Sequence, residues 1–189
     1  KRNMVAVIYL NNSWDWSGGY GFYLKHAGKG DSPSAEGDGY NNYARYAAQF
    51  VRNEKAKQLF YDYVRKIVSR KNSVTGRYYK DDPTIMAWQI GNEPRSFSVE
   101  GKNDFLAYMH TTATLIKGID PNHMVSAGSE GSVGCENDMD LYEQIHADPA
   151  YDYLTIHIWP ANWQWCGKAR LWEDLMNVYQ KTEQYIDAH

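Results

Sequence analysis

Apolar and polar positions alternate along the chain in blocks, with short β-branched runs followed by segments of helical spacing. The apolar runs lie at 4–10, 84–90, 123–127 and 153–158. The segments with helical spacing lie at 54–70, 104–117, 138–147 and 171–188. Strands that are apolar throughout, and that alternate with helices, are typical of a parallel sheet covered by helices. The pattern therefore predicts an α/β fold.

The segment 11–52 is rich in glycine and serine and follows the first predicted strand. We predict a long loop there, and loops of such length inside compact domains are usually functional. In a (β/α)8 barrel, the loops at the carboxyl ends of the strands build the active site. The sequence lacks the signature of a dinucleotide-binding fold, because no Gly-x-Gly-x-x-Gly follows a predicted strand.

Four β/α units make half of a (β/α)8 barrel, whose usual length is about 250 residues. The chain is then either the central part, residues 1–189, of a longer catalytic domain, or a small open α/β sheet. We favour the partial barrel, because the first strand has no lead-in and the last helix simply ends. A half barrel on its own would leave two open parallel edges, which promote aggregation.

Charge and composition narrow the class of protein. The net charge is −3 and no basic run occurs, which argues against nucleic acid as a partner. No apolar run approaches the length of about 18 residues that a membrane span needs.

Cys135 and Cys166 lack zinc-finger spacing, and both follow predicted strand ends. They are either bridged to each other or two free thiols.

The strongest candidate for chemistry is Asn92-Glu93-Pro94, which directly follows the second predicted strand. Pro94 ends the strand ladder because it has no N–H to donate. Glu93 is then held at the rim of the sheet, with the amide of Asn92 beside it. A carboxylic acid whose pKa is raised by apolar neighbours can protonate a leaving oxygen. The alternative is a glutamate that only caps the following turn.

Five of the seven tryptophans follow predicted strand ends. Sugar rings present flat C–H faces that pack on aromatic rings, while their hydroxyls need polar partners. His157 and Trp159 are two positions apart on the fourth predicted strand, so both side chains should point the same way. Together with Trp14 and Trp163, they indicate a carbohydrate cleft.

The sequence lacks the motifs of other classes of enzyme. Neither His-x-x-x-His nor His-Glu-x-x-His occurs, so we expect no metal and no other cofactor. No Gly-x-Ser-x-Gly elbow for a serine hydrolase occurs either. Carboxylate chemistry remains, and a retaining glycosidase holds two carboxyl groups about 5–5.5 Å apart. From spacing alone, Glu130 is the best partner for Glu93, as a catalytic or a sugar-binding group.

Four ordered blocks of the chain closely resemble glycoside hydrolase family 5, and specifically its β-mannanase branch. The blocks are Asn11-Asn-Ser-Trp14-Asp-Trp16-Ser-Gly-Gly19, Ala87-Trp-Gln-Ile-Gly-Asn-Glu-Pro-Arg95, Gly128-Ser-Glu-Gly131 and His157-Ile-Trp-Pro-Ala-Asn-Trp163. The resemblance implies strands three to six of a (β/α)8 TIM barrel. It also implies an endo-acting, retaining hydrolase of β-1,4-mannan.

The resemblance also implies a role for each matching residue. Glu93 is the acid/base, and Asn92 hydrogen-bonds the sugar 2-hydroxyl. Arg95 lies on the leaving-group side of the cleft, and Trp14 lines the sites around the cleavage point. His157 is the active-site histidine, and Trp159 stands where many relatives carry tyrosine.

The family's nucleophile is a glutamate at the end of strand seven, which implies a position past His189. Glu130 then becomes a binding or supporting residue, and we adopt that assignment although spacing alone offers it as the catalytic partner. Trp163 completes the predicted substrate-binding residues.

Three rival interpretations stay open. The protein is an exo-acting mannosidase of the same branch if the 11–52 loop blocks one end of the cleft. Another family 5 specificity is disfavoured by Arg95 and the Trp-Ser-Gly-Gly block. A non-catalytic carbohydrate-binding barrel is the rival from another class. The resemblance further implies secretion, or a periplasmic or cell-surface location, although no signal-peptide pattern precedes the first predicted strand.

Overall fold

The computed structural model describes residues 3–167, 169–170 and 172–189. These residues form two compact units, Lys1–Thr155 and Ile156–His189. Each unit is considered by itself.

The described part of the first unit contains the strands β1 (Ala6–Tyr9), β2 (Ile85–Gln89) and β3 (Met124–Ser126), and the helices α1 (Gly19–Leu24), α2 (Tyr40–Ala47), α3 (Glu54–Val68), α4 (Lys102–Ile119) and α5 (Met139–His146). The second unit contains α6 (Leu175–Ala188). The helices predicted at 54–70, 104–117 and 138–147 are confirmed to within two residues at each end.

The three strands form one parallel sheet in the order β1-β2-β3. Val7 pairs with Ala87, which in turn pairs with Met124, and the register of β1 on β2 shifts by one residue between Ala6 and Val7. Because all strands run the same way, their carboxyl ends meet at one edge. Every segment that follows a strand therefore begins at that edge.

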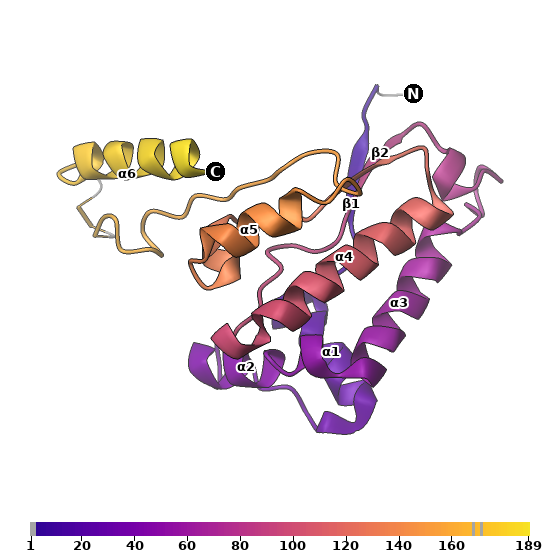
Figure 1. Ribbon diagram of the computed structural model, residues 1–189, viewed down its shortest axis with the longest axis horizontal. Coiled ribbons are helices and arrows are strands. Elements are labelled where there is room, and N and C mark those ends of the chain that lie inside the picture. Colours follow the sequence, from indigo (N-terminus) through magenta and orange to yellow (C-terminus); the bar gives the residue numbers. More distant parts are fainter. Residues whose placement is uncertain (1–2, 168, 171) are drawn as a thin grey trace. The chain divides into compact units, whose positions relative to one another are not determined.

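Helices α3 and α4 lie side by side in the outer layer of the first unit (Figure 1). Helix α3 begins at a capped end, because the Asn53 side chain accepts a hydrogen bond from the Ala56 amide at 2.9 Å. Its apolar stripe of Phe60, Val64 and Val68 is fully buried. The spacing of four positions places these side chains on one face, which is the face turned to the core.

The two faces of the sheet differ in exposure. Trp88 and Val125 are paired neighbours on one face, and both are fully buried. On the opposite face Val7, Tyr9 and Met124 remain exposed. In a (β/α)8 barrel the face turned away from the helices lines the interior. Apolar side chains therefore lie on both faces of the sheet, as the continuous apolar strands predict.

The prediction of a plain loop at 11–52 is wrong. The segment folds into α1 and α2 with short helical turns between and after them. Tyr20 in α1 and Tyr43 in α2 are buried, as is Phe50, which stacks on Tyr20 at 4.2 Å between ring centroids. Burial of these aromatic rings stabilises helices whose glycine and serine content alone does not favour them.

The fourth predicted strand, at 153–158, is not formed. The chain leaves the edge of β3 after a short contact, in which the Asp152 amide donates to the Val125 carbonyl at 2.9 Å. The boundary between the two compact units falls within this segment, between Thr155 and Ile156. Beyond this contact, no backbone ladder between residues 153–158 and β3 is formed, despite the apolar composition of the segment.

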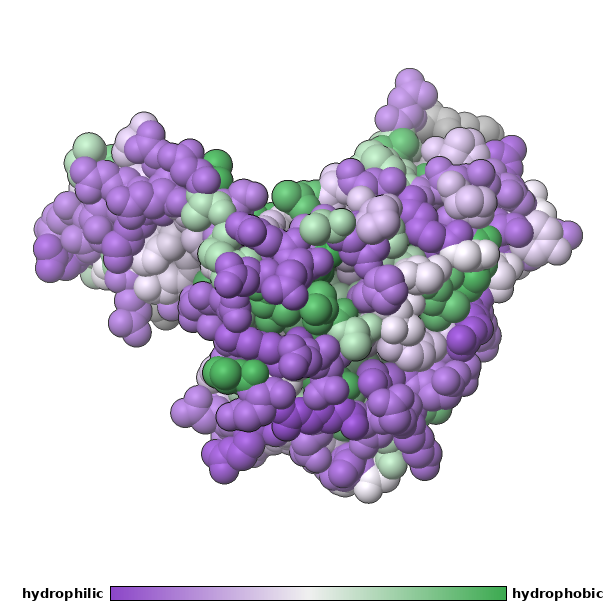
Figure 2. Space-filling view, viewed as in Figure 1, coloured by the Kyte–Doolittle hydropathy of each residue, from purple (hydrophilic) through white to green (hydrophobic). Residues whose placement is uncertain are grey.

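The outer surface around α4 and α5 is mostly hydrophilic, with hydrophobic residues grouped between the helices (Figure 2). Among the described residues, no helix has the length and apolar character needed to cross a membrane.

Candidate active site

Glu93 is fixed by the strands on both sides of β2. The amide of Asn92 donates to the carbonyl of Asn11 at 2.9 Å, just past β1. The amide of Glu93 donates to the carbonyl of Gly128 at 3.0 Å, just past β3. Three strand ends are thereby joined around one glutamate, which is the arrangement that the sequence predicts for a rigid catalytic group.

The backbone around Glu93 is unusual. Glu93 has a φ of 51°, in the left-handed region that side chains other than glycine rarely adopt. Gly128 opposite it has a φ of 75°, and a Cβ there would lie 1.9 Å from the Gly91 carbonyl oxygen. Non-glycine residues in this conformation cluster at functional sites, where the surrounding structure enforces them.

The side chain of Glu93 is 8% exposed, and its Oε2 accepts a hydrogen bond of 2.7 Å from the indole Nε1 of Trp14. Trp14 follows β1 and Glu93 follows β2, so the contact joins two neighbouring strand ends. The structure therefore brings together two residues that the sequence predicts for the site.

Next to Trp14 and Glu93, Arg95 and Glu130 form an ion pair that is joined by two hydrogen bonds. Arg95 Nε and Nη2 lie 2.5 Å and 2.6 Å from the two carboxylate oxygens of Glu130, which is 1% exposed. Burial opposes the charge on Arg95, but hydrogen bonding to Glu130 and the attraction of nearby negative charges together outweigh it and raise the pKa of the guanidinium. Arg95 also donates to the hydroxyl of Tyr40 at 3.2 Å. Glu130 is thus committed to Arg95 through both oxygens, which favours a supporting role over that of a nucleophile.

Trp14 is packed among rings rather than open to solvent. It is 8% exposed, and the ring of Trp16 lies nearly parallel to it at 5.3 Å and 17°. The guanidinium of Arg95 is 4.9 Å from the ring centroid, a cation–π distance. Trp16 itself is 68% exposed. The indole available to a sugar face is therefore chiefly Trp16, with Trp14 beneath it.

Helix α2 supports this aromatic group. The buried ring of Tyr43 lies 6.2 Å from Trp14 at 24°, and its hydroxyl donates to the carbonyl of Ser13. The hydroxyl of Ser13 in turn accepts from the amide of Arg95 at 3.0 Å. The first and second strand ends are therefore locked together through side chains as well as backbone.

The Asn92 side chain is half-buried and makes no hydrogen bond to the part of the chain that the structure describes. Its amide offers two donors and one acceptor oxygen. Asn92 stays a predicted substrate-binding residue, and it lies next to Glu93 in the chain.

His157, Trp159 and Trp163 belong to the second unit, so they are not part of the geometry above. The expectation that His157 and Trp159 share a strand face loses its basis, because their segment is not a strand. His157 is half-buried and Trp159 is half-exposed. Trp163 packs against Tyr185 of α6 at 5.1 Å. All three remain predicted substrate-binding residues.

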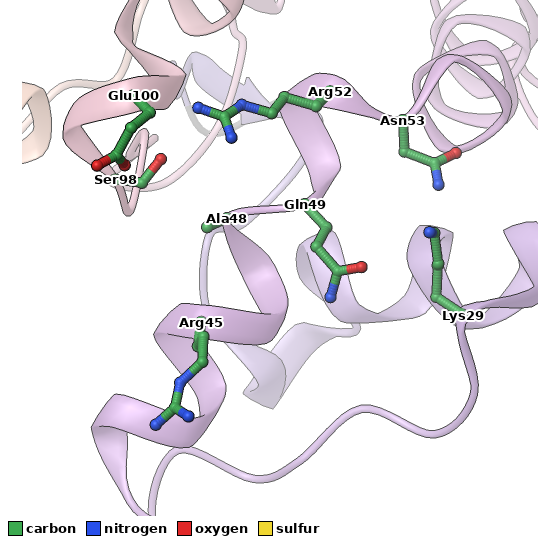
Figure 3. Close-up of a pocket in the computed structure, with 8 residues that line it drawn as sticks. All are labelled: Lys29, Arg45, Ala48, Gln49, Arg52, Asn53, Ser98 and Glu100. Atoms are coloured by element: carbon green, nitrogen blue, oxygen red, sulfur yellow. The ribbon is translucent and has the colours of Figure 1, made fainter.

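A separate hollow of about 280 Å³ lies between α2, the start of α3 and the segment before α4 (Figure 3). Polar and charged residues predominate among those that line it: Lys29, Arg45, Ala48, Gln49, Arg52, Asn53, Ser98 and Glu100. Arg52 also pairs with Asp104 at 3.3 Å. None of the predicted site residues lines this hollow, so it is distinct from the site around Glu93.

Within the described residues, no three His, Cys, Asp or Glu side chains gather in a way that could hold a metal ion. Cys135 and Cys166 are both free thiols in this structure. Burial raises the pKa of the Cys135 thiol to about 12, so this thiol is a poor nucleophile at neutral pH.

Two residues of the site were given no role of their own in the sequence-based prediction. Trp16 lies within the predicted Trp14 block, and its alternation with Trp14 could have marked it. Tyr40 lies in the segment predicted as a loop, and no local pattern marks it as a partner of Arg95. Only the fold of α2 brings Tyr40 to the site.

Comparison with known proteins shows which family this chain resembles in sequence and fold. The whole of residues 1–189 matches the family model described as GH family 5 beta-mannosidase-like. Mannan endo-1,4-beta-mannosidase 1 of Arabidopsis thaliana is 32% identical over 99% of this chain, which spans 44% of that relative. The chain thus spans less than half the length of this relative.

Solved structures of Rhizomucor miehei enzymes share the fold. A variant of its glycoside hydrolase family 5 mannosidase, in complex with mannosyl-fructose, superposes with a TM-score of 0.74 at 34% identity. That match covers 86% of this chain and 38% of the mannosidase. The endo-1,4-beta-mannanase of the same organism gives a TM-score of 0.69 at 27% identity, covering 88% of this chain and 47% of that one. The predicted partial (β/α)8 barrel is confirmed.

Proposed function

We propose that the protein is a retaining hydrolase of β-1,4-mannan. The premise is that this chain belongs to the β-mannosidase-like group of glycoside hydrolase family 5. The observation that carries the proposal is Glu93 itself. It is a nearly buried carboxyl group at a strand end, hydrogen-bonded by Trp14 and adjacent to the Arg95–Glu130 pair. Relatives named mannan endo-1,4-beta-mannosidase support the choice of substrate.

In the first step of the proposed reaction, Glu93 gives its proton to the glycosidic oxygen while a carboxylate attacks the anomeric carbon. The C–O bond to the leaving sugar breaks, and a glycosyl–enzyme ester forms. The attacking group is not assigned among residues 1–189; the resemblance to the family implies a glutamate after a later strand. Glu130 is a poor choice for this role, since both of its oxygens bind Arg95.

In the second step, the Glu93 carboxylate takes a proton from water, and the hydroxide attacks the same anomeric carbon. The ester bond breaks and returns the attacking carboxylate. Two successive inversions give net retention of the β-configuration. Glu93 thus ends the cycle protonated, as it began.

The neighbours of Glu93 supply recognition. The half-buried amide of Asn92 hydrogen-bonds the sugar 2-hydroxyl, and the exposed ring of Trp16 packs against a sugar face. Arg95, His157, Trp159 and Trp163 contribute further sugar contacts, with Glu130 holding Arg95 in place. No cofactor takes part, because acid/base and nucleophilic carboxylates suffice for the reaction.

An exo-acting β-mannosidase is the second candidate. It is favoured by the similarity to the Rhizomucor miehei mannosidase and by the folding of 11–52 into α1 and α2 beside Trp14. A folded segment at the end of β1 is placed to close one end of a cleft at the sheet edge.

The test is the course of β-1,4-mannohexaose hydrolysis by the full-length protein, followed by ¹H NMR and chromatography. Endo action predicts mannobiose and mannotriose as early products, with the β-anomer formed first. Mannose and mannopentaose as the early products identify the exo enzyme. Binding of mannohexaose without hydrolysis identifies a non-catalytic carbohydrate-binding protein, and no effect on mannan with hydrolysis of cellulose identifies another specificity.

Secretion, or a periplasmic or cell-surface location, is part of the same proposal, because polymeric mannan must be cut before it can enter a cell. Fractionation of the producing cells with an antibody to this chain tests it. Retention of the protein in the cytoplasm would contradict it.

A further inference from the structure

The indole of Trp14 and the carboxyl of Glu93 make a contact whose direction is fixed by chemistry. Trp14 Nε1 is 2.7 Å from Glu93 Oε2, and each residue is only 8% exposed. An indole nitrogen is a donor and never an acceptor. Oε2 is therefore the accepting oxygen of this contact, and because a carbonyl oxygen accepts better than a hydroxyl oxygen, the contact favours the acidic proton on Oε1.

We propose that Trp14 is the positioning residue of Glu93, holding Oε2 so that Oε1 delivers the proton to the leaving oxygen. This inference rests on the proposed function, because it takes Glu93 as the acid/base. It assigns Trp14 a task beyond lining the cleft, and it leaves sugar packing mainly to Trp16.

The surroundings of Trp14 suit that task. Its amide donates to Asn12 Oδ1 at 3.0 Å, which fixes the backbone at the start of the side chain. The rings of Trp16 and Tyr43 lie nearly parallel to the indole, and the guanidinium of Arg95 lies over it. The indole thus cannot turn its N–H away from Glu93 without displacing several packed groups.

Charged groups also act on Glu93, and they must be separated from the effect of Trp14. The positive charge of Arg95 interacts with Glu93, and Arg95 is itself paired with Glu130 and bonded to the Tyr40 hydroxyl. Replacing Trp14 with phenylalanine removes the N–H but changes none of these charges. Any shift in the titration of Glu93 in that variant therefore reports mainly on the lost hydrogen bond.

The chain offers a matched control in Trp88. Its Nε1 also donates to a carboxylate, Asp120 Oδ2, at 2.7 Å, and its ring is fully buried. The carboxylate of this second pair follows α4 and precedes β3, whereas Glu93 follows β2. Trp88→Phe therefore repeats the chemical change and its cost to stability without touching Glu93.

The first measurement is the pH profile of kcat/KM on β-1,4-mannan for the full-length protein and both variants. We expect Trp14→Phe to lower kcat about 10-fold to 100-fold, because the acid is less well oriented. We also expect the basic limb of the profile to move to higher pH, because ionised Glu93 loses a donor. Trp88→Phe should leave the basic limb in place. An unmoved limb in Trp14→Phe, or equal shifts in both variants, would overturn the proposal.

The second measurement needs no activity. In the full-length protein labelled with ¹⁵N-tryptophan, the indole resonance that disappears in Trp14→Phe should titrate with pH. That titration should vanish in Glu93→Gln. A Trp14 resonance that ignores pH, or that titrates unchanged in Glu93→Gln, would refute the bond even in an active mannanase. A resonance that behaves as expected in a protein without mannanase activity would instead leave the bond standing and refute the proposed function.

Discussion

Arg95 and Glu130 are joined by two parallel hydrogen bonds, of 2.5 Å and 2.6 Å, between the ends of β2 and β3. The pair is largely buried, and a planar guanidinium matches a carboxylate at two points in a way that lysine cannot. It supports Trp14, over whose ring the guanidinium lies. The pair thus connects the strand end that carries Glu93 to the next strand.

Replacing Glu130 with glutamine should lower the free energy of unfolding by about 3 kcal/mol, because the buried guanidinium of Arg95 loses the counter-ion that contacts it at two points. Urea denaturation measures this loss. The control is Asp62→Asn, which breaks the exposed contact with Arg65 and should cost less than about 1 kcal/mol. Equal stability of Glu130→Gln and the parent would contradict the role given to the pair.

A second substitution at Glu130 distinguishes a supporting role for this residue from that of the nucleophile. In Glu130→Ala, activity on mannan should fall but keep its retaining course, and sodium azide should produce no mannosyl azide of inverted configuration. Formation of the α-azide would identify Glu130 as the nucleophile. Product configuration is read by ¹H NMR.

Trp16 should contribute to substrate binding rather than to the chemical step. Because its ring is exposed beside Trp14, Trp16→Ala should raise KM for mannohexaose about 10-fold with little change in kcat, a loss of roughly 1.4 kcal/mol. Trp172→Ala, which removes another highly exposed indole, serves as the control and should leave KM unchanged. Identical kinetics for Trp16→Ala and the parent would remove Trp16 from the cleft.

Gly128 should tolerate no side chain. Its φ is 75°, and an added Cβ would lie only 1.9 Å from the Gly91 oxygen, so Gly128→Ala must shift the backbone that holds the Glu93 amide. We expect a loss of about 2–3 kcal/mol in stability together with a fall in kcat. Gly118→Ala is the counterpart in α4, where the added methyl meets open space and should stabilise by up to about 1 kcal/mol. Thermal unfolding of both variants checks the prediction.

Asp120 should make the fold sensitive to acid. Although burial opposes its charge, hydrogen bonds from Trp88 and His123 outweigh burial and lower the pKa of its carboxyl. A carboxyl whose folded pKa lies below its unfolded value of about 3.9 stabilises the fold above that pH, and the contribution is lost as pH falls through the folded pKa. Asp120→Asn should therefore be less stable at pH 7 but lose less on acidification. Parallel stability curves from pH 7 to pH 2 would show that Asp120 does not titrate in this way.

Much of the first unit follows from local pattern. Helix α3 has a stripe of buried residues at spacings of four, and an asparagine cap at its start, so its position could be predicted within two residues. Strand β2 is apolar from Ile85 to Trp88 and ends before Pro94. Glu93 stands out for the same reason, because the signals that end the strand also place the glutamate.

The remaining features depend on contacts between distant residues. Helices α1 and α2 form because aromatic side chains bury against Phe50 and Trp14. The glycine-rich composition of the segment does not predict these contacts. The partnership of Arg95 with Glu130 spans 35 positions, and no spacing rule reveals it. The segment 153–158 has strand composition but only a short contact with β3, because a strand needs a partner as well as apolar residues.

Glu93→Gln in the full-length protein tests the central claim most directly. The substitution keeps the side chain's shape but leaves no proton to give to a leaving oxygen. Hydrolysis of β-1,4-mannan should fall by at least about 100-fold, while binding of mannohexaose, measured by calorimetry, stays within a few-fold of the parent. Undiminished hydrolysis of mannan by this variant would contradict the account.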